Sequence, residues 1–530
     1  MKPQEGSMWR GTVVLTIAAF VTKLFSAFYR IPYQNIVGDV GFYIYQQVYP
    51  IYGIAMSLSL YGYPIVISKL IAERIAERDR TGIASVLQVS LLFLCSLGLF
   101  IFAVLYIGAA QLAIWMGDGK LAPSIRLLSI SFLLFPFVAL LRGYFQGHNK
   151  MVPTAVSQVG EQFVRVSGIL FLSYWFIKSG YDVYTCGTAA MAGTLAGGLT
   201  ALLLLTVFWI RRENRGRIRI KTNRAETKRI ISYLFIKGII ICVTNMVLTL
   251  IPLVDSFLLL SLLSQRGGES MEHVKLLKGI YDRGQPLIQM GTVVATSFSL
   301  ALVPLISGAK KRRNEQFLYE KIDLSLRIAL VLGLGASLGL ICLIRPINIM
   351  LFKNDLGSLS LAILMASVFF TTLALTLSAL LQGMGYEWVA VVGVFVAVAV
   401  KSALNYLLVP VLGMIGAAIG TTMSYAAMAC FLYVALRQKL PFYVPKKTYI
   451  YSVAKAASAM VIVLQLYMLL AERWGTGRLF AVGEALGGVL LGAVIYVTVV
   501  IKGNVFSEQE LSFLPFSNKL RVLLGIGDGK

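Results

Sequence analysis

Apolar segments about twenty residues long recur along almost the whole chain, separated by short polar or Gly/Pro-containing breaks. A helix of about 20 such residues crosses the hydrocarbon core of a bilayer, because all its backbone groups are hydrogen-bonded internally. The 530 residues are 58% hydrophobic and 14% charged, whereas soluble domains are about half apolar and a quarter charged. The sequence therefore predicts an all-α polytopic membrane protein.

The apolar runs and their charged, glycine or proline breaks give about fourteen predicted transmembrane helices. They centre near residues 20, 56, 97, 133, 166, 198, 246, 292, 335, 370, 398, 424, 460 and 490. The segments near 56 and 292 contain prolines and glycines that can interrupt a helix. No small-residue cleavage site follows the first run, so we interpret it as a membrane helix rather than a signal peptide.

The net charge of +24 is concentrated in short loops between the apolar segments. With the N-terminus inside, the inner loops hold Lys69, Arg74, Arg78, Arg80, Arg142, Lys150, the run Arg211–Arg229, Lys310–Arg313, Arg437, Lys439, Lys446 and Lys447. The outer loops hold few basic residues, such as Lys120, Lys178 and Arg266. Cytoplasmic loops of membrane proteins carry this excess. We predict a multi-pass protein of the cytoplasmic membrane, with both termini cytoplasmic and no nucleic-acid partner.

The sequence offers no cluster of metal ligands. The cysteines, all in apolar segments and outside ligand spacing, are Cys95, Cys186, Cys242, Cys342 and Cys430. His148 and His273 lie in predicted loops on opposite sides of the membrane. Buried cysteines that act as small hydrophobic residues explain this pattern better than a metal site or disulfides. We predict no metal and no cofactor, and leave coupling to a monovalent cation or to the membrane potential open.

Two pairs of segments in the chain resemble each other in the same order. The stretch that starts at Leu141, "LRGYFQGHNKMVPTAVSQVGEQFVRVSGILFL", aligns without gaps with "LSALLQGMGYEWVAVVGVFVAVAVKSALNYLL" from Leu377, which places Arg165 on Lys401. The stretch "YGYPIVIS" likewise resembles "LALVPLIS", with Pro64 on Pro304. Two matches at nearly the same offset indicate an internal duplication.

Each copy of this duplication spans about six helices, and an even number keeps both copies in the same orientation. We therefore expect two six-helix lobes in a parallel pseudo-twofold repeat, followed by two additional helices. The predicted parts are residues 1–228 with a basic linker, 229–440, and 441–530 with a cytoplasmic tail. Two such lobes facing each other are typical of alternating-access transporters.

Charged side chains inside membrane segments are costly and usually face a polar interior. The charged candidates for substrate binding are Lys23, Arg30, Glu161, Arg165, Arg283 and Lys401. Lys23 and Arg30 are two helical turns apart, so they share one helix face at a separation of about 10 Å. A cationic face of that length suits an anionic ligand. The alternative is that Arg30 and Arg283 extend to the membrane interface, where long basic side chains reach water.

Three further residues are candidates for ion coupling: Asp255, Asn405 and Thr421. Asp255 is a lone carboxylate in the apolar run "LIPLVDSFLL", and such residues mark ion pathways in membrane proteins. The alternative is a local salt bridge between Asp255 and one of the cations. Glu161 and Arg165 are also ambiguous, because their i, i+4 spacing allows them to pair with each other.

Several of these stretches together resemble one family. "SAFYRIPYQNIVGD", "YPIVISKLIAER", "YFQGHNKMVPTAVSQVGEQFVR" and "YDRGQPL" are similar to the polysaccharide transporter branch of the multidrug/oligosaccharidyl-lipid/polysaccharide (MOP) exporter superfamily. Within it, the chain resembles the stage V sporulation protein B and YabM-like groups, which are related to lipid II flippases of the MurJ type. The resemblance extends from about Thr12 to the last predicted segment.

This resemblance implies two six-helix lobes around a V-shaped cavity, with the two added helices forming a groove for a lipid tail. It also implies that the protein, embedded in the lipid bilayer, moves an undecaprenyl-diphosphate-linked saccharide from one side of the membrane to the other. We expect the protein to be a monomer. In the lipid II flippases, arginines of the first, second and eighth helices line the cavity. The first-helix cations correspond here to Lys23 and Arg30, and the eighth-helix arginine to Arg283. The second helix has no matching arginine and offers Gln46 and Gln47 near that place.

The chemistry of such a substrate agrees with the candidate residues. A diphosphate needs cations in a cleft of low dielectric constant. Gln46 and Gln47, with Tyr43 and Tyr45, suit the hydroxyl groups of a sugar. The alternative for these four residues is ordinary helix packing, and for the tyrosines also an interfacial aromatic belt.

Other functions fit the sequence less well. A multidrug/cation antiporter of the same superfamily would favour carboxylates in its cavity, whereas embedded cations outnumber acids here. A membrane glycosyltransferase or polymerase would need acids in an extramembrane part, but Arg211–Arg229 holds only Glu213 and Glu226. No Gly-rich phosphate loop occurs, so ATP is not a direct energy source. A purely structural scaffold leaves the duplication and the embedded charges unexplained. We therefore predict a flippase that works by alternating access, not an enzyme.

Overall fold

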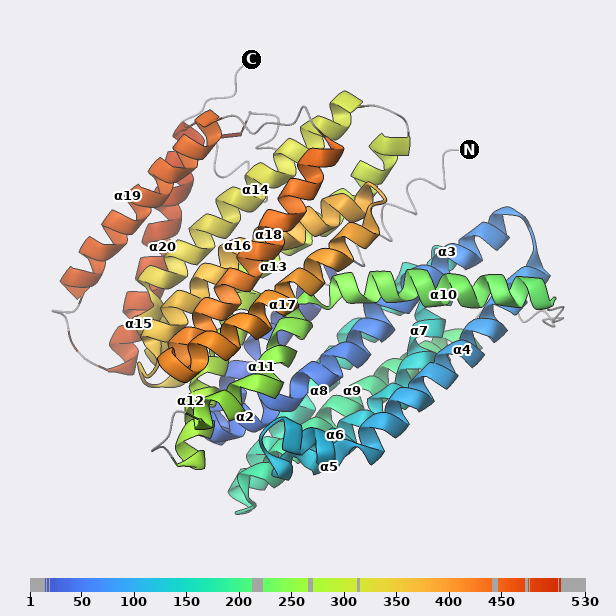
Figure 1. The fold of residues 1–530 in the computed structure, drawn as a ribbon, viewed down its shortest axis with the longest axis horizontal. Helices are drawn as coiled ribbons and strands as arrows, with labels where there is room; N and C mark the ends of the chain where they lie inside the picture. Colours follow the sequence, from blue (N-terminus) through green and yellow to red (C-terminus); the bar gives the residue numbers. More distant parts are fainter. Residues whose placement is uncertain are drawn as a thin grey trace. The chain divides into compact units, whose positions relative to one another are not determined.

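The structure is a computed structural model that describes residues 15, 17–18, 20–211, 223–265, 270–311, 315–440, 447–471, 475, 477–503 and 505–506. Within these ranges all regular secondary structure is helical (Figure 1). The prediction of an all-α polytopic protein is confirmed. Most of the basic run Arg211–Arg229 lies outside the described residues.

The helices follow one another along the chain with few and short connections. After a helical stretch at 20–28 come α2 (Arg30–Ser57), the π-helical turn η1 (Leu58–Gly62), α3 (Tyr63–Ala76), α4 (Arg80–Ile107), α5 (Ala109–Trp115), the 3-10 turn η2 (Gly119–Leu121), α6 (Ala122–Ser129), α7 (Ser131–Gly147), α8 (Met151–Lys178), α9 (Val183–Ile210), α10 (Arg224–Asn245), α11 (Val247–Ser264) and α12 (Met271–Asp282). They continue with α13 (Gly284–Lys311), α14 (Glu315–Cys342), α15 (Ile344–Phe352), α16 (Ser358–Gly383), α17 (Glu387–Leu412), α18 (Met414–Lys439), α19 (Lys447–Ala471) and α20 (Arg478–Lys502).

Eleven helical segments of the described chain are long and apolar enough to cross a membrane. The first, Phe20–Ala76, has 57 residues, which at 1.5 Å per residue is about 85 Å, far more than one bilayer thickness. Of the predicted centres, all fall within helices except 246, which lies at the turn between α10 and α11. The predicted number of about fourteen spans is not confirmed by this count.

Two irregularities divide the long first segment. Gly38 has φ +71° and ψ −176°, a conformation that side-chain-bearing residues avoid, so the helical path bends inside α2. The π-helical turn η1 ends at Gly62, where a Cβ atom would collide with Cys242 Sγ of α10. This turn is the break anticipated from the prolines and glycines near residue 56. It allows α3 to continue in a new direction toward α7.

The chain divides into two compact units, Met1–Pro286 with Ala390–Gly420, and Leu287–Val389 with Thr421–Lys530. In the first unit, α8 and α9 run side by side along their length (Figure 1). Their close approach depends on glycine, because a Cβ on Gly168 would lie 3.0 Å from the Cα of Gly193. Small residues let transmembrane helices approach in this way. The packing orients Glu161 and Arg165 of α8 away from the lipid, so both are buried.

In the second unit, α19 and α20 pack on each other, and both pack on α14. The Tyr496 hydroxyl of α20 donates to the Val331 carbonyl of α14 at 2.8 Å. Arg327 of α14 donates to the Val505 carbonyl at 2.7 Å, which fastens the segment that follows α20. The predicted lobe boundaries at 228/229 and 440/441 remain predictions.

Candidate anion-binding site

Two arginines are buried in the first unit without a carboxylate partner among the described residues: Arg30 is 1% exposed and Arg165 is 0% exposed. The Arg30 guanidinium carbon lies 4.4 Å from the centre of the Tyr49 ring and 6.0 Å from that of Tyr29. The Arg165 guanidinium carbon lies 5.4 Å from the centre of the Tyr29 ring and 5.2 Å from that of Tyr52. Both cations therefore contact Tyr29.

The hydrogen bonds of these arginines leave donors unused. Arg165 donates to Ser26 Oγ at 3.3 Å and weakly to Met56 Sδ at 3.7 Å. The Nε atoms of Arg30 and Arg165 are buried without a hydrogen-bond partner. A buried donor without a partner costs free energy, and a buried unpaired charge costs more. An anion beside these two guanidinium groups would satisfy both needs.

The tyrosines form a row because of their spacing. Tyr45, Tyr49 and Tyr52 occupy positions i, i+4 and i+7 of α2, which lie on one helix face. Successive ring centres are 5.8 and 6.1 Å apart, and the hydroxyls of Tyr29 and Tyr45 are hydrogen-bonded at 2.8 Å. Aromatic faces stabilise the cations in part. These rings are part of the candidate site; they do not form an exposed aromatic belt.

Glu161 has a different partner from the one that sequence spacing suggests. Its Oε2 atom accepts from Arg142 Nη2 at 2.8 Å, and its Oε1 atom accepts from the Tyr52 hydroxyl at 3.3 Å. The prediction that Arg142 lies in a cytoplasmic loop is wrong: α7 continues to Gly147, and Arg142 is fully buried. Arg142 therefore neutralises Glu161, and Arg165 has no carboxylate partner among the residues that the structure describes.

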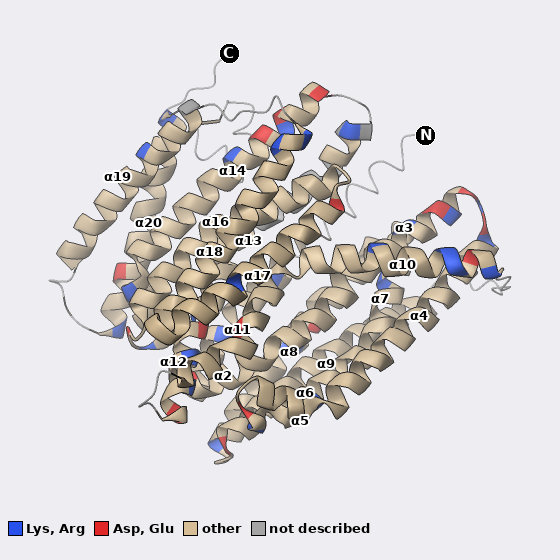
Figure 2. Cartoon of the chain, in the orientation of Figure 1, with Lys and Arg blue, Asp and Glu red and all other residues tan. Residues whose placement is uncertain are grey.

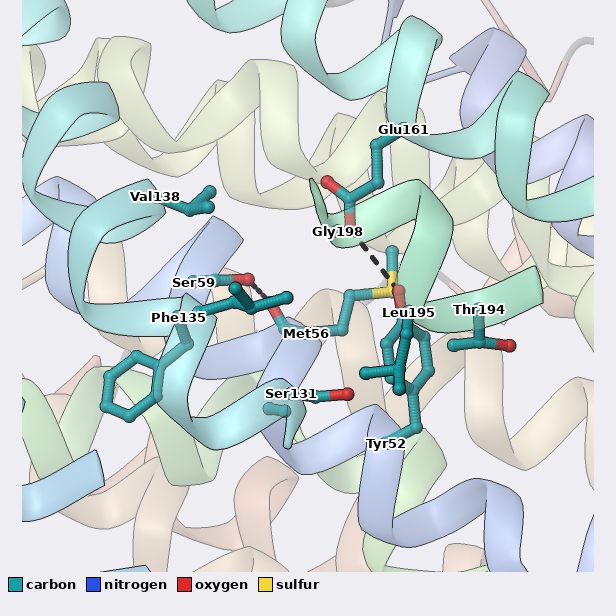
Figure 3. Close-up of a pocket in the computed structure, with 12 residues that line it drawn as sticks. Tyr52, Met56, Ser59, Ser131, Phe135, Val138, Glu161, Thr194, Leu195 and Gly198 are labelled. Atoms are coloured by element: carbon teal, nitrogen blue, oxygen red, sulfur yellow. Dashed lines mark hydrogen bonds between the residues drawn. The ribbon is translucent and has the colours of Figure 1, made fainter. Parts of the chain in front are cut away.

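A small cavity lies beside Glu161, which points toward Tyr52 in Figure 3. Its volume of about 20 Å³ is enough for one water molecule. Ser59 and Ser131 also line it, and Ser131 Oγ has no hydrogen-bond partner. A water at this place would join the ion pair of Glu161 to polar groups of α7.

Arg283 is buried too, but its charge is neutralised. Its Nε and Nη2 atoms donate to the two carboxylate oxygens of Asp39 at 2.9 and 2.6 Å, and Gln34 donates to the same carboxylate at 2.8 Å. Full burial of Arg30 and Arg283 argues against side chains that extend to the membrane interface. Asp39 was missed as a functional candidate, although it stands directly after Gly38 in the stretch "SAFYRIPYQNIVGD".

The other predicted substrate residues of the first helices lie in different surroundings. Lys23 is half-buried on the helix that leads into α2, and backbone hydrogen bonds at Tyr29 and Tyr33 keep that helix continuous to Arg30. Gln47 donates to the Met116 and Ser256 carbonyls at 3.0 and 2.7 Å, so it joins helices. Gln46 is buried, and its Oε1 atom has no partner.

The remaining candidates gather around Asp255. Lys401 Nζ lies 2.7 Å from Asp255 Oδ1, and Asn405 Nδ2 donates to the same oxygen at 2.8 Å. Asp255 thus forms the local salt bridge that the sequence left open as the alternative to ion coupling. Its partner is Lys401, which was predicted to bind substrate. Thr421 is buried in the second unit.

A second buried carboxylate cluster was not anticipated from the sequence. Asp118 accepts from the hydroxyls of Tyr43 and Tyr184 at 3.1 and 2.6 Å, and pairs with Lys275 at 2.8 Å. Tyr43 therefore has a structural partner.

Figure 2 shows that α4 and α9 are almost free of charged residues along their lengths, as lipid-facing helices require.

Comparison with known proteins gives consistent results. Residues 8–310 match the family model described as polysaccharide biosynthesis protein. The chain is 45% identical to the uncharacterized membrane protein YabM of Bacillus subtilis (strain 168), covering 97% of this chain and 96% of that protein. From the same organism, the lipid II flippase MurJ is 24% identical, with 95% and 94% covered. Stage V sporulation protein B is also 24% identical, with 96% and 98% covered.

Among solved structures, the inward-facing conformation of a multidrug resistance MATE family transporter of the MOP superfamily has the same fold, with a TM-score of 0.66. The identity is 18%, and the match covers 81% of this chain and 98% of that one. The fold and the helices define a multi-pass membrane protein with the fold of MOP superfamily transporters. The chain belongs to the polysaccharide biosynthesis protein family. The resemblance to the polysaccharide transporter branch is confirmed.

Proposed function

We propose that this transporter moves an undecaprenyl-diphosphate-linked saccharide across the cytoplasmic membrane by alternating access. Arg30 and Arg165 bind the diphosphate. The observation that carries this proposal is the pair of fully buried guanidinium groups beside the Tyr29 ring, neither of which forms a salt bridge with a carboxylate of the described residues.

Charge separates this proposal from drug export. A cationic drug would be repelled by two unpaired guanidinium groups, whereas a diphosphate offers oxygens to their free N–H donors. The tyrosine hydroxyls of α2 supply further polar contacts next to the cations. The name of the relative MurJ, a lipid II flippase, supports the same substrate class.

This proposal changes which residues hold the diphosphate. The sequence suggested Lys23, Arg30 and Arg283 as the cations for the diphosphate, but Arg283 already has Asp39 as its partner. Arg165 of α8 approaches the Tyr52 ring of α2 to 5.2 Å. It thereby places a positive charge beside the part of α2 from Gln46 to Ser57, which has no basic residue of its own.

The direct test is binding of lipid-linked saccharide to purified protein. Arg30→Ala and Arg165→Ala should each weaken binding about tenfold to a hundredfold, because one charge-assisted contact contributes roughly 1.5–3 kcal/mol. Lysine at either position should restore binding only in part, since an ammonium cannot contact phosphate bidentately. The matched control is Lys178→Ala, which removes an exposed cation from the end of α8. Unchanged affinity in both folded arginine variants would refute the site.

The nature of the saccharide needs a second experiment. The protein is expressed in a strain depleted of its own lipid II flippase, and growth of the peptidoglycan layer is measured. Restored growth with the natural chain, and none with Arg165→Ala at equal membrane abundance, would identify lipid II as a substrate. Absence of rescue by a correctly inserted natural chain would direct the search to other undecaprenyl-linked saccharides.

A further inference from the structure

At Asp255, the buried ammonium group of Lys401 is contacted by oxygen atoms of the protein. Lys401 Nζ contacts Asp255 Oδ1 at 2.7 Å and the Ala417 carbonyl at 3.0 Å. The Tyr281 hydroxyl donates to Asp255 Oδ2 at 3.3 Å. Lys401 and Asp255 are 0% and 2% exposed at their side chains, so water contributes little to this charge balance.

This arrangement has the chemistry of a monovalent-cation site. A carboxylate and a backbone carbonyl are the hard oxygen ligands that alkali ions take, and an ammonium group is close in size to K⁺. One more oxygen is available nearby, because Asn405 Oδ1 is fully buried without a hydrogen-bond partner. Asn405 itself stands one helical turn after Lys401 on α17.

We propose that Lys401 is a built-in counter-ion that fills a monovalent-cation site at Asp255. As a consequence, transport by this protein is not coupled to a cation bound there. The consequence rests on the proposed transport function, whereas occupancy of the site is measured without any transported substrate.

The charge balance predicts what happens when the ammonium is removed. Lys401→Met keeps most of the aliphatic length of the side chain but leaves Asp255 as an unpaired buried carboxylate. Breaking a buried ion pair on one side is strongly destabilising, whereas replacing both partners is tolerated far better. The variant should therefore acquire a stabilising alkali-ion site that the natural protein does not have.

The experiment measures the thermal unfolding temperature of the purified full chain in NaCl or KCl, with choline chloride at the same ionic strength as control. A bound ion raises that temperature in a saturable way. The natural chain should show no difference between the salts. Lys401→Met should be less stable in choline and should gain several degrees with Na⁺ or K⁺. The double variant Asp255→Asn with Lys401→Met should be stable and insensitive to the salt.

Two outcomes would overturn the proposal. The first is a saturable Na⁺ or K⁺ response of the natural chain that disappears in Asp255→Asn, since the site then binds an ion beside Lys401. The second is a Lys401→Met variant that remains unstable in every salt while the double variant is stable, since no cation then replaces the ammonium. Neither result depends on lipid-linked saccharide binding, so the proposed function is judged separately.

Discussion

The buried arginines of the first unit are of two kinds. Arg142 and Arg283 each have a carboxylate partner, Glu161 and Asp39, at 2.8 and 2.6 Å. Arg30 and Arg165 have aromatic rings in place of a carboxylate. The two kinds should respond differently to substitution, because removing a paired arginine leaves a buried anion, whereas removing an unpaired one relieves a buried charge.

The Asp39–Arg283 pair provides a test of this difference. Arg283→Met should destabilise the protein by about 3–5 kcal/mol, because Asp39, whose side chain is only 12% exposed, is left without its cationic partner. Adding Asp39→Asn should recover most of that loss. The measurement is the free energy of unfolding of the single and double variants, with Arg165→Met as the comparison that should cost less. Equal losses for Arg283→Met and Arg165→Met would contradict the assignment of one arginine as paired and the other as unpaired.

At this scale the sequence predicts which charged side chains are buried better than it predicts their partners. Arg30, Arg165, Lys401 and Asp255 stand out because charge is rare in apolar runs. Their partners depend on packing between helices. Spacing along one helix suggests Glu161 with Arg165, but Arg142 of α7 reaches Glu161 across the interface with α8. Such contacts between helices are set by tertiary structure, which spacing within a single helix does not encode.

Among the helices, α8 and α9 determine where Arg165 lies. A Cβ on Gly193 would lie 2.5 Å from Ile169 N and 2.6 Å from the carbonyl carbon of Gly168, and these backbone atoms cannot move aside alone. Gly198, on the same helix, is a matched control, because its Cβ would meet only Leu134 Cδ1 at 3.4 Å.

Gly193→Ala should therefore force α9 away from α8 and move Arg165 relative to Tyr29 and Tyr52. We expect a loss of about 1–3 kcal/mol in the free energy of unfolding, as for other overpacked interfaces, together with weaker binding of lipid-linked saccharide. Gly198→Ala should behave like the natural chain in both measurements. If the two alanine variants are equally stable and bind equally well, the close helix contact is not what positions Arg165.

At the scale of the whole molecule, the apolar runs predict helices at nearly every expected place, because burial in a bilayer leaves few alternatives for the backbone. The number of crossings is harder to derive, since Phe20–Ala76 is one helical path that bends at Gly38 and again at η1. The grouping of helices into units is harder still: residues 390–420 pack with Met1–Pro286, and this depends on contacts between distant parts of the chain.

Orientation of the chain in the membrane can be tested on α10 and α11. Of these two helices, α11 (Val247–Ser264) is long and apolar enough to span the membrane, whereas α10 is not in that group. We therefore expect one crossing between Lys228, near the end of the basic run Arg211–Arg229, and Glu272 at the start of α12. Arg215 and Gly268, the positions that the loop charges alone would select, lie outside the described residues. Because positively charged loops stay in the cytoplasm, Lys228 should be inside and Glu272 outside.

The measurement uses single cysteines on a cysteine-free background and a thiol reagent that does not cross membranes. Glu272→Cys should react in intact cells, and Lys228→Cys only after the membrane is permeabilised. Both substitutions are at exposed positions, so accessibility within the protein does not limit the reaction. Reaction of both cysteines in intact cells would mean that α10 crosses the membrane as well. Reaction of Lys228→Cys alone would mean that the chain is inserted the other way round, and the cytoplasmic location of both termini would have to be abandoned.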